Sequence, residues 1–124
     1  MLKKFLPVLL LPLLLAGCAA RVTNLTPLQQ MRNANNLYPV EAAMDSRQQT
    51  LRWQSVQPQI LVGSEICQMR ATPLMSNRWE GLIPVPAGAS SVEYRYKIDY
   101  QYNRMGAPGH NTVLSKKYLL KITD

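Results

Sequence analysis

The sequence is poor in the side chains that carry most metal-binding chemistry. Its 124 residues include one His, two Cys and seven acidic residues. The single His110 lies in a segment rich in Gly and Pro, with no Cys or carboxylate within four residues. A metal site needs three or four converging ligands. We therefore expect no bound metal and no cofactor.

The same scarcity limits catalysis. Nucleophilic catalysis needs a nucleophile, a base and a group that orients the base, and His110 is the only conventional base. Glu93 and Asp99 lie six residues apart on one predicted strand face. That spacing is about 20 Å, which is too far for two carboxylates to act on one bond. We expect a protein that is not an enzyme.

Basic residues outnumber acidic residues, and they are scattered. The chain has 14 Lys and Arg against 7 Asp and Glu, which gives a formal net charge of +7. No basic run exceeds two residues, so the charge belongs to a solvated surface, and no nucleic-acid partner is expected. Such a surface would gain a modest attraction to anionic lipid headgroups.

The N-terminus concentrates apolar residues. Residues 1–4 form a short basic head, and residues 5–15 follow as an uncharged segment of mostly Leu, Val and Pro. This segment is too short to cross a hydrocarbon core as a helix, which takes about 20 residues. A basic head before an apolar segment of this length indicates a secretory signal.

The signal ends in Leu15-Ala16-Gly17-Cys18, which resembles the lipobox of bacterial lipoproteins. The resemblance implies cleavage between Gly17 and Cys18, a diacylglyceryl group on the Cys18 thiol and an acyl group on its new amine. Several acyl chains on one residue anchor a protein lastingly, whereas one chain binds only marginally. In Gram-negative lipoproteins an Asp after the Cys often signals inner-membrane retention; Ala19 therefore favours the outer membrane. A secretion signal cut elsewhere, with an incidental Cys, is the alternative.

Processing would change the composition. Residues 1–17 are the expected signal peptide, and their removal takes away two lysines and lowers the net charge from +7 to +5. Cys67 would be the remaining thiol, so no intramolecular disulfide is expected in this oxidising compartment. We interpret Cys67 as a small buried apolar residue. Pairing with another chain and chemical reactivity are the alternatives.

Residues 18–36 are polar and rich in Asn and Gln, and we interpret them as the lipidated Cys followed by a tether. A flexible coil of about 18 residues would have an r.m.s. span of about 25 Å. Residues 21–26 are alternatively a first edge strand that ends at Pro27.

Residues 37–124 form the predicted domain, and short strands separated by turns run through it. Apolar residues alternate over residues 37–44, residues 59–72 read as a hairpin that turns at Gly63-Ser64, and residues 77–86 read as an edge strand. Ser46 with Gln49 resembles a capping box and would start at most one helical turn. Residues 104–111 are predicted to form a mobile loop, and residues 117–124 a closing strand.

The clearest pattern covers residues 91–103. Val, Tyr and Ile occupy every even position from Val92 to Tyr102, and polar residues occupy every odd position. A strand with one buried and one wet face is the economical interpretation. We expect this strand to be central, with the C-terminal strand beside it.

Six or seven short strands without a long amphipathic helix predict an all-β fold, a small antiparallel immunoglobulin-like β-sandwich behind the signal and tether. A small open barrel is the alternative. Residues 79–88 and 93–99 are also similar to the early-set domains, which include glycogen-binding modules. That resemblance favours the immunoglobulin-like fold, although Tyr100 stands where those modules have Gly.

The aromatic residues have two interpretations. They fill the core with their hydroxyls at its rim, or they form a stacking platform for sugars or a partner. The candidates for such a contact are Trp53, Trp79, Tyr100 and Tyr102.

Lipobox, single-domain length and missing catalytic groups together predict a function. We expect a non-enzymatic, membrane-anchored lipoprotein of the cell envelope that binds or scaffolds an envelope protein or polysaccharide. A surface-displayed carbohydrate-binding module is the alternative.

Overall fold

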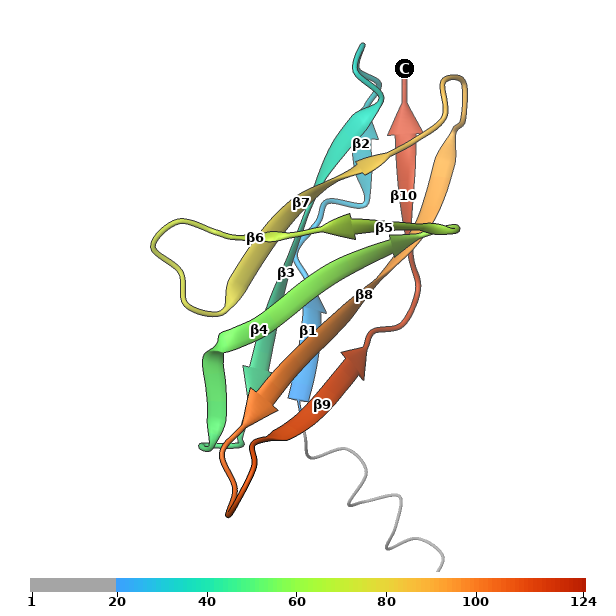
Figure 1. Cartoon of the computed structure of the whole chain (residues 1–124). Coiled ribbons are helices and arrows are strands. Elements are labelled where there is room, and N and C mark those ends of the chain that lie inside the picture. Colours follow the sequence, from blue (N-terminus) through green and yellow to red (C-terminus); the bar gives the residue numbers. More distant parts are fainter. Residues whose placement is uncertain (1–19) are drawn as a thin grey trace, which may run out of the picture.

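The structure is a computed structural model that describes residues 20–124, and this part of the chain is built from strands (Figure 1). Within it, no helix is long and apolar enough to cross a membrane. The strands are β1 (Ala20–Asn24), β2 (Gln29–Met31), β3 (Leu37–Ser46), β4 (Leu51–Val62), β5 (Glu65–Gln68), β6 (Arg70–Ala71), β7 (Arg78–Pro84), β8 (Ser91–Tyr102), β9 (Gly109–Leu114) and β10 (Tyr118–Thr123).

The strands form two sheets that pack face to face. One sheet has the order β1-β3-β7-β6, and the other has the order β2-β10-β8-β4-β5, with β9 also paired to β8. The pairs are antiparallel except for β2, which lies parallel to β10. The first order is that of immunoglobulin strands A-B-E-D, and β10-β8-β4 is that of G-F-C. The predicted immunoglobulin-like β-sandwich is therefore confirmed.

Strand β8 is central, as the alternating pattern predicts. Its even-numbered residues point between the sheets, where Tyr94, Tyr96, Ile98 and Tyr100 are buried. It pairs with β4 along one edge and with β10 and β9 along the other. The C-terminal strand β10 thus lies beside it, also as predicted.

The predicted hairpin is confirmed over residues 59–68, whereas Arg70 and Ala71 cross to the other sheet and pair with β7. Gln59 to Val62 of β4 pair with Gln68 to Glu65 of β5. Gly63 makes the turn at a φ of +59°, a left-handed conformation that glycine adopts at little cost. Because this conformation favours glycine, the Gly63-Ser64 pair indicates the turn in the sequence.

The structure corrects the predicted tether. Within residues 18–36, β1 pairs with β3 from Ala20↔Ser46 to Asn24↔Ala42, and β2 pairs with β10. The alternative of an edge strand near residues 21–26 describes β1 better. Ala20 is therefore already part of the sandwich. Asn24 is half-buried and hydrogen-bonded to Tyr94, whereas Gln29, Asn33 and Asn35 stay exposed on the surface of the fold.

Three further differences concern the strands and the turns between them. The described residues hold ten strands where six or seven were expected. The predicted loop at 104–111 is shorter, because β9 begins at Gly109 and takes in His110. Residues 47–50 form a turn instead of a helical turn, and the Gln48 N–H donates to Ser46 Oγ at 3.1 Å.

A cluster of hydrogen bonds joins the two sheets where the chain crosses between them. The Tyr96 hydroxyl donates to Asn24 Oδ1 at 2.7 Å and lies 3.2 Å from Thr26 Oγ1. The Glu41 N–H donates to Thr26 Oγ1 at 2.9 Å, and Asn24 Nδ2 donates to the Tyr94 hydroxyl at 2.8 Å. The cluster holds β8 against β1 and β3, and the segment between β1 and β2 therefore has a defined path.

Replacing Tyr96 by Phe removes the central hydroxyl of this cluster. We expect the free energy of unfolding to fall by about 1–3 kcal/mol, because buried acceptors lose their donor. Chemical denaturation measures this change. Tyr118→Phe is the matched control, since it removes a hydroxyl outside the cluster; an equal loss there would contradict the role of the cluster.

The cluster also makes stability depend on pH. Burial raises the pKa of the Tyr96 hydroxyl, so the folded chain holds this proton more tightly than the unfolded chain, whose tyrosines titrate near about pH 10. The contribution is complete below that pH and is lost as the pH rises above it. Between about pH 10 and 11, the free energy of unfolding should therefore fall less with rising pH in Tyr96→Phe than in the parent chain.

A groove at one end of the sandwich

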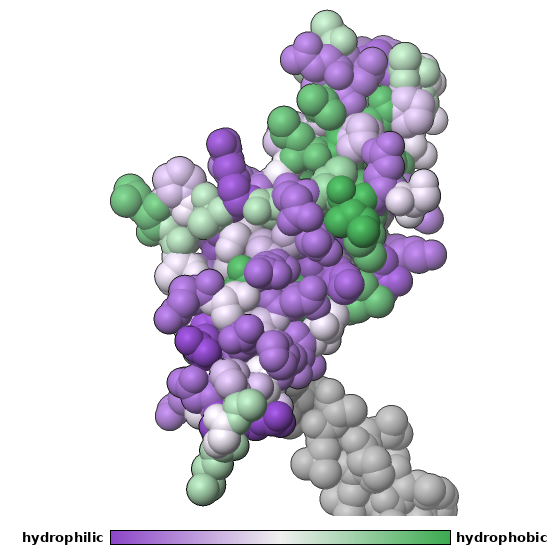
Figure 2. All heavy atoms as spheres, in the orientation of Figure 1, coloured by the Kyte–Doolittle hydropathy of each residue, from purple (hydrophilic) through white to green (hydrophobic). Residues whose placement is uncertain are grey.

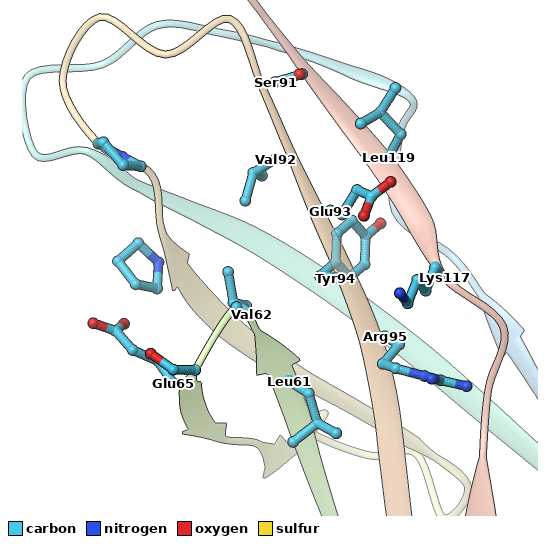
Figure 3. Close-up of a pocket in the computed structure, with 14 residues that line it drawn as sticks. Leu61, Val62, Glu65, Ser91, Val92, Glu93, Tyr94, Arg95, Lys117 and Leu119 are labelled. Carbon is cyan, nitrogen blue, oxygen red and sulfur yellow. The ribbon is translucent and has the colours of Figure 1, made fainter.

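The described residues form an open groove of about 1000 Å³ at the end of the sandwich where β8 begins (Figure 3). The β4–β5 hairpin forms one side, and the segment before β10 with the start of β10 forms the other. The start of β8 runs between them, and Pro84, the last residue of β7, and Pro86 also line the groove.

The groove exists because β4 stops pairing with β8 before the first residues of β8 are covered. The pairing of β4 with β8 ends at Leu61↔Arg95, where the chain turns into β5, whereas β8 extends back to Ser91. On its other edge β8 stays paired with β10 as far as Ser91↔Lys121. One edge of β8 at Ser91 and Glu93 therefore borders the groove.

The backbone polar groups of this edge point into the groove. Ile122 N–H donates to Ser90 O, and Tyr96 N–H donates to Ser115 Oγ, so the even-numbered residues of β8 direct their backbone groups toward β10 and β9. Backbone groups of successive strand residues point to opposite edges. Ser91 and Glu93 therefore present their N–H and C=O groups to the groove.

Side chains of mixed character line the groove. Leu61, Val62, Val92 and Leu119 supply apolar surface, and Leu119 is 45% exposed. Glu65, Glu93, Arg95 and Lys117 supply two charges of each sign. Figure 3 shows the Glu93 and Lys117 side chains on the β10 side and Glu65 on the hairpin side. The groove thus combines apolar contact with polar groups that orient a ligand.

Ser115 fixes the wall on the β10 side. This buried residue lies between β9 and β10, donates its N–H to Tyr96 O at 2.9 Å, and accepts the Tyr96 N–H on Oγ at 2.8 Å. The Arg95 guanidinium Nε donates to Ser115 O at 2.9 Å. Arg95 is therefore held in place beside the groove rather than free to move.

Three of the four aromatic residues proposed as a stacking platform lie in or against one core cluster, so they form no exposed platform. Trp79 and Tyr100 are 6% and 2% exposed and lie in a core cluster with Met44, Leu51 and Ile98. Tyr102 is half-buried, and its ring covers Gly109, where an added Cβ would lie 2.2 Å from the ring. Trp53 is 39% exposed. None of the four lines the groove.

Trp53 lies on an irregular part of β4. The register of β4 with β8 shifts between Arg52 and Gln57, so β4 bulges over the residues between them. Ser55 Oγ accepts the Gln101 N–H at 2.8 Å and donates to Arg52 O, so a side chain replaces a ladder bond. Bulges of this kind re-aim side chains, and here the bulge carries the exposed Trp.

The titratable groups give little reactive chemistry. Burial, with a smaller contribution from Glu65, raises the pKa of the Cys67 thiol, so it stays protonated and weakly nucleophilic at neutral pH. Cys67 is half-buried and packs against the core, less completely than the sequence suggests. His110 is exposed on β9. Among residues 20–124, no group of three His, Cys, Asp or Glu side chains is placed to hold a metal.

The predicted lipidation and cleavage sites, Cys18 and Gly17, lie outside the described residues. Ser91, Glu93 and Leu119 were missed by the sequence interpretation, which placed the odd-numbered residues of β8 on a solvated face. One signal was available, because a Gly turn at 63 and prolines at 84 and 86 mark points where strands leave their sheets.

Comparisons with known proteins add little. No family model matches the chain, and no curated protein matches it. Among solved structures, the chain is similar to murine CRIg, with 11% identity and a TM-score of 0.45, over 84% of this chain and 99% of that chain. A likeness at this level carries no functional argument, and the fold assignment rests on the strand order.

Proposed function

We propose that this protein is a non-enzymatic lipoprotein, anchored by Cys18 in the outer membrane, whose groove binds a protein or polysaccharide of the cell envelope. One observation carries the proposal: the groove and the start of β1 lie at opposite ends of the sandwich. Strand β8 begins at the groove and ends at Tyr102, which pairs with Leu51. Leu51 follows the turn after Ser46, and Ser46 is the residue that pairs with Ala20 at the start of β1. An anchor before Ala20 would leave the groove open to a partner.

The distance between the two ends favours this arrangement. Strand β8 has 12 residues and runs the length of the sandwich (Figure 1). At about 3.3 Å per residue it spans roughly 35 Å. The groove would then stand beyond the lipid headgroups, where an envelope component can reach it.

The chemistry of the groove favours binding. Its edge offers backbone donors and acceptors at Ser91 and Glu93, its walls offer Leu61 and Leu119, and Arg95 is already held by Ser115. Ordered polar groups beside apolar surface reduce the cost of binding a partner, because few side chains need to be immobilised. These features suit recognition rather than the positioning of a reacting bond.

The anchor is tested with Cys18→Ala. We expect the variant to be missing from the outer-membrane fraction and to keep its precursor signal, because the thiol that receives the lipid is missing. Cell fractionation with immunoblotting measures both effects. The Cys67→Ser variant should fractionate like the parent chain, and an unchanged distribution of Cys18→Ala would contradict the anchor.

The groove is tested by photo-crosslinking in cells with a benzophenone amino acid at Leu119. We expect a discrete adduct that Leu61→Asp abolishes, because a charge in the wall disfavours the apolar contact. The matched control places the same amino acid at Leu74, an exposed loop residue away from the groove. An adduct that forms equally from both positions, or persists in Leu61→Asp, would contradict groove binding.

The carbohydrate-binding alternative now rests on Trp53, the exposed aromatic on the β4 bulge. It predicts that a glucan quenches Trp53 fluorescence and that Trp53→Phe abolishes the change. Trp79 is the internal control, because this buried ring should keep its emission in both chains. Absence of quenching across storage and cell-wall polysaccharides would contradict this alternative and leave the groove proposal unaffected.

A further inference from the structure

We propose that the end of the sandwich opposite the groove docks onto anionic lipid headgroups, with Met105 at the point of contact. This end, called the lower end here, comprises the start of β1, the turn at residues 47–50 and the loop at residues 103–108. The inference rests on the proposed lipidation of Cys18. It adds a second, noncovalent membrane contact made by the folded domain.

The first argument is the length of chain between the anchor and the fold. Cys18 lies two residues before Ala20, and two peptide units span at most about 7 Å. Ala20 is paired with Ser46 and packs against the core cluster that contains Met44, Leu51 and Trp79. A lipid on Cys18 would therefore hold the lower end against the headgroups, whereas the tether first expected at residues 18–36 would have kept it away.

The second argument is the position of the 103–108 loop. Asn103 N–H donates to Thr50 O at 2.8 Å, and Leu51 pairs with Tyr102, so this loop and the 47–50 turn lie together. Strand β1 packs beside β9, which follows the loop. In Figure 1 the loop between β8 and β9 projects from the same end of the sandwich as the start of β1.

The third argument is charge complementarity. The exposed basic side chains at the lower end are Arg21, Arg47 and Arg104. The exposed Asp45 of the neighbouring strand β3 lies opposite Arg21 in the strand register. A basic surface is attracted to anionic lipids. The groove end differs, because its lining carries two acidic and two basic residues.

The loop is also shaped to present an apolar tip. Met105 is 100% exposed, Gly106 turns the chain at a φ of +84°, and Arg104 Nε donates to Ala107 O at 2.9 Å across the turn. Figure 2 shows pale green side chains at this tip with purple, hydrophilic side chains above them. An apolar tip beside basic residues suits the lipid interface, where the apolar group leaves water and the charges meet headgroups.

The test places an environment-sensitive nitrobenzoxadiazole label at position 105 of the full lipidated chain, using Met105→Cys with Cys67→Ser. Vesicles of phosphatidylethanolamine with phosphatidylglycerol supply the anionic surface, and phosphatidylcholine vesicles supply the neutral one. We expect a several-fold rise in emission with a blue shift on the anionic vesicles, and a smaller change on the neutral ones. The matched control labels Leu74→Cys, since Leu74 is another fully exposed apolar loop residue, on the β6–β7 loop at the side of the sandwich (Figure 1).

The outcomes separate the docking from the anchor. If the chain co-floats with the vesicles but the label at position 105 shows the same emission as without vesicles, the anchor stands and the docking is overturned. A chain that does not float overturns the anchor and the docking with it. A label that responds only after a partner protein is added would make the lower end a protein contact, which also overturns the inference.

Discussion

The Tyr96 hydroxyl is the interaction on which the arrangement of this sandwich depends. It donates to Asn24 Oδ1 and lies beside Thr26 Oγ1, so it connects central strand β8 to the segment that passes from one sheet to the other. Burial raises its pKa, so it remains a donor at physiological pH. Because this crossing has a defined path, β1 adds to the first sheet and β2 adds to the second, and Ala20 is already part of the sandwich.

The two ends of the sandwich differ in the features that they present. At the lower end, Ala20 pairs with Ser46 two residues after Cys18, and three exposed arginines accompany Met105. At the opposite end, the pairing of β4 with β8 stops at Arg95, although β8 starts at Ser91. The groove opens along this unpaired edge of β8. We propose that attachment and recognition lie at opposite ends of strand β8.

Much of the fold was predictable, because a period of two fixes which face of a strand is buried. The pattern over residues 91–103 predicted β8 and its central place, and Gly63 predicted the hairpin turn. The segment before residue 37 was misread, because Asn24 and Thr26 look solvated in sequence yet have partners some 70 residues away. The groove was not predictable, since it depends on where the pairing of two distant strands ends. For the same reason the sequence left open whether Trp79 and Tyr100 belong to the core or to a platform.

The proposed anchor at Cys18 and the place of Ala20 in β1 together predict that the sandwich lies directly against the membrane. Neutron reflectometry of the lipidated chain on a supported bilayer measures the distance between the lipid headgroups and the protein layer directly. The account predicts a protein layer roughly 35–45 Å thick that begins at the headgroups. A hydrated gap on the order of 25 Å between the headgroups and the protein, the span of an 18-residue coil, would contradict it.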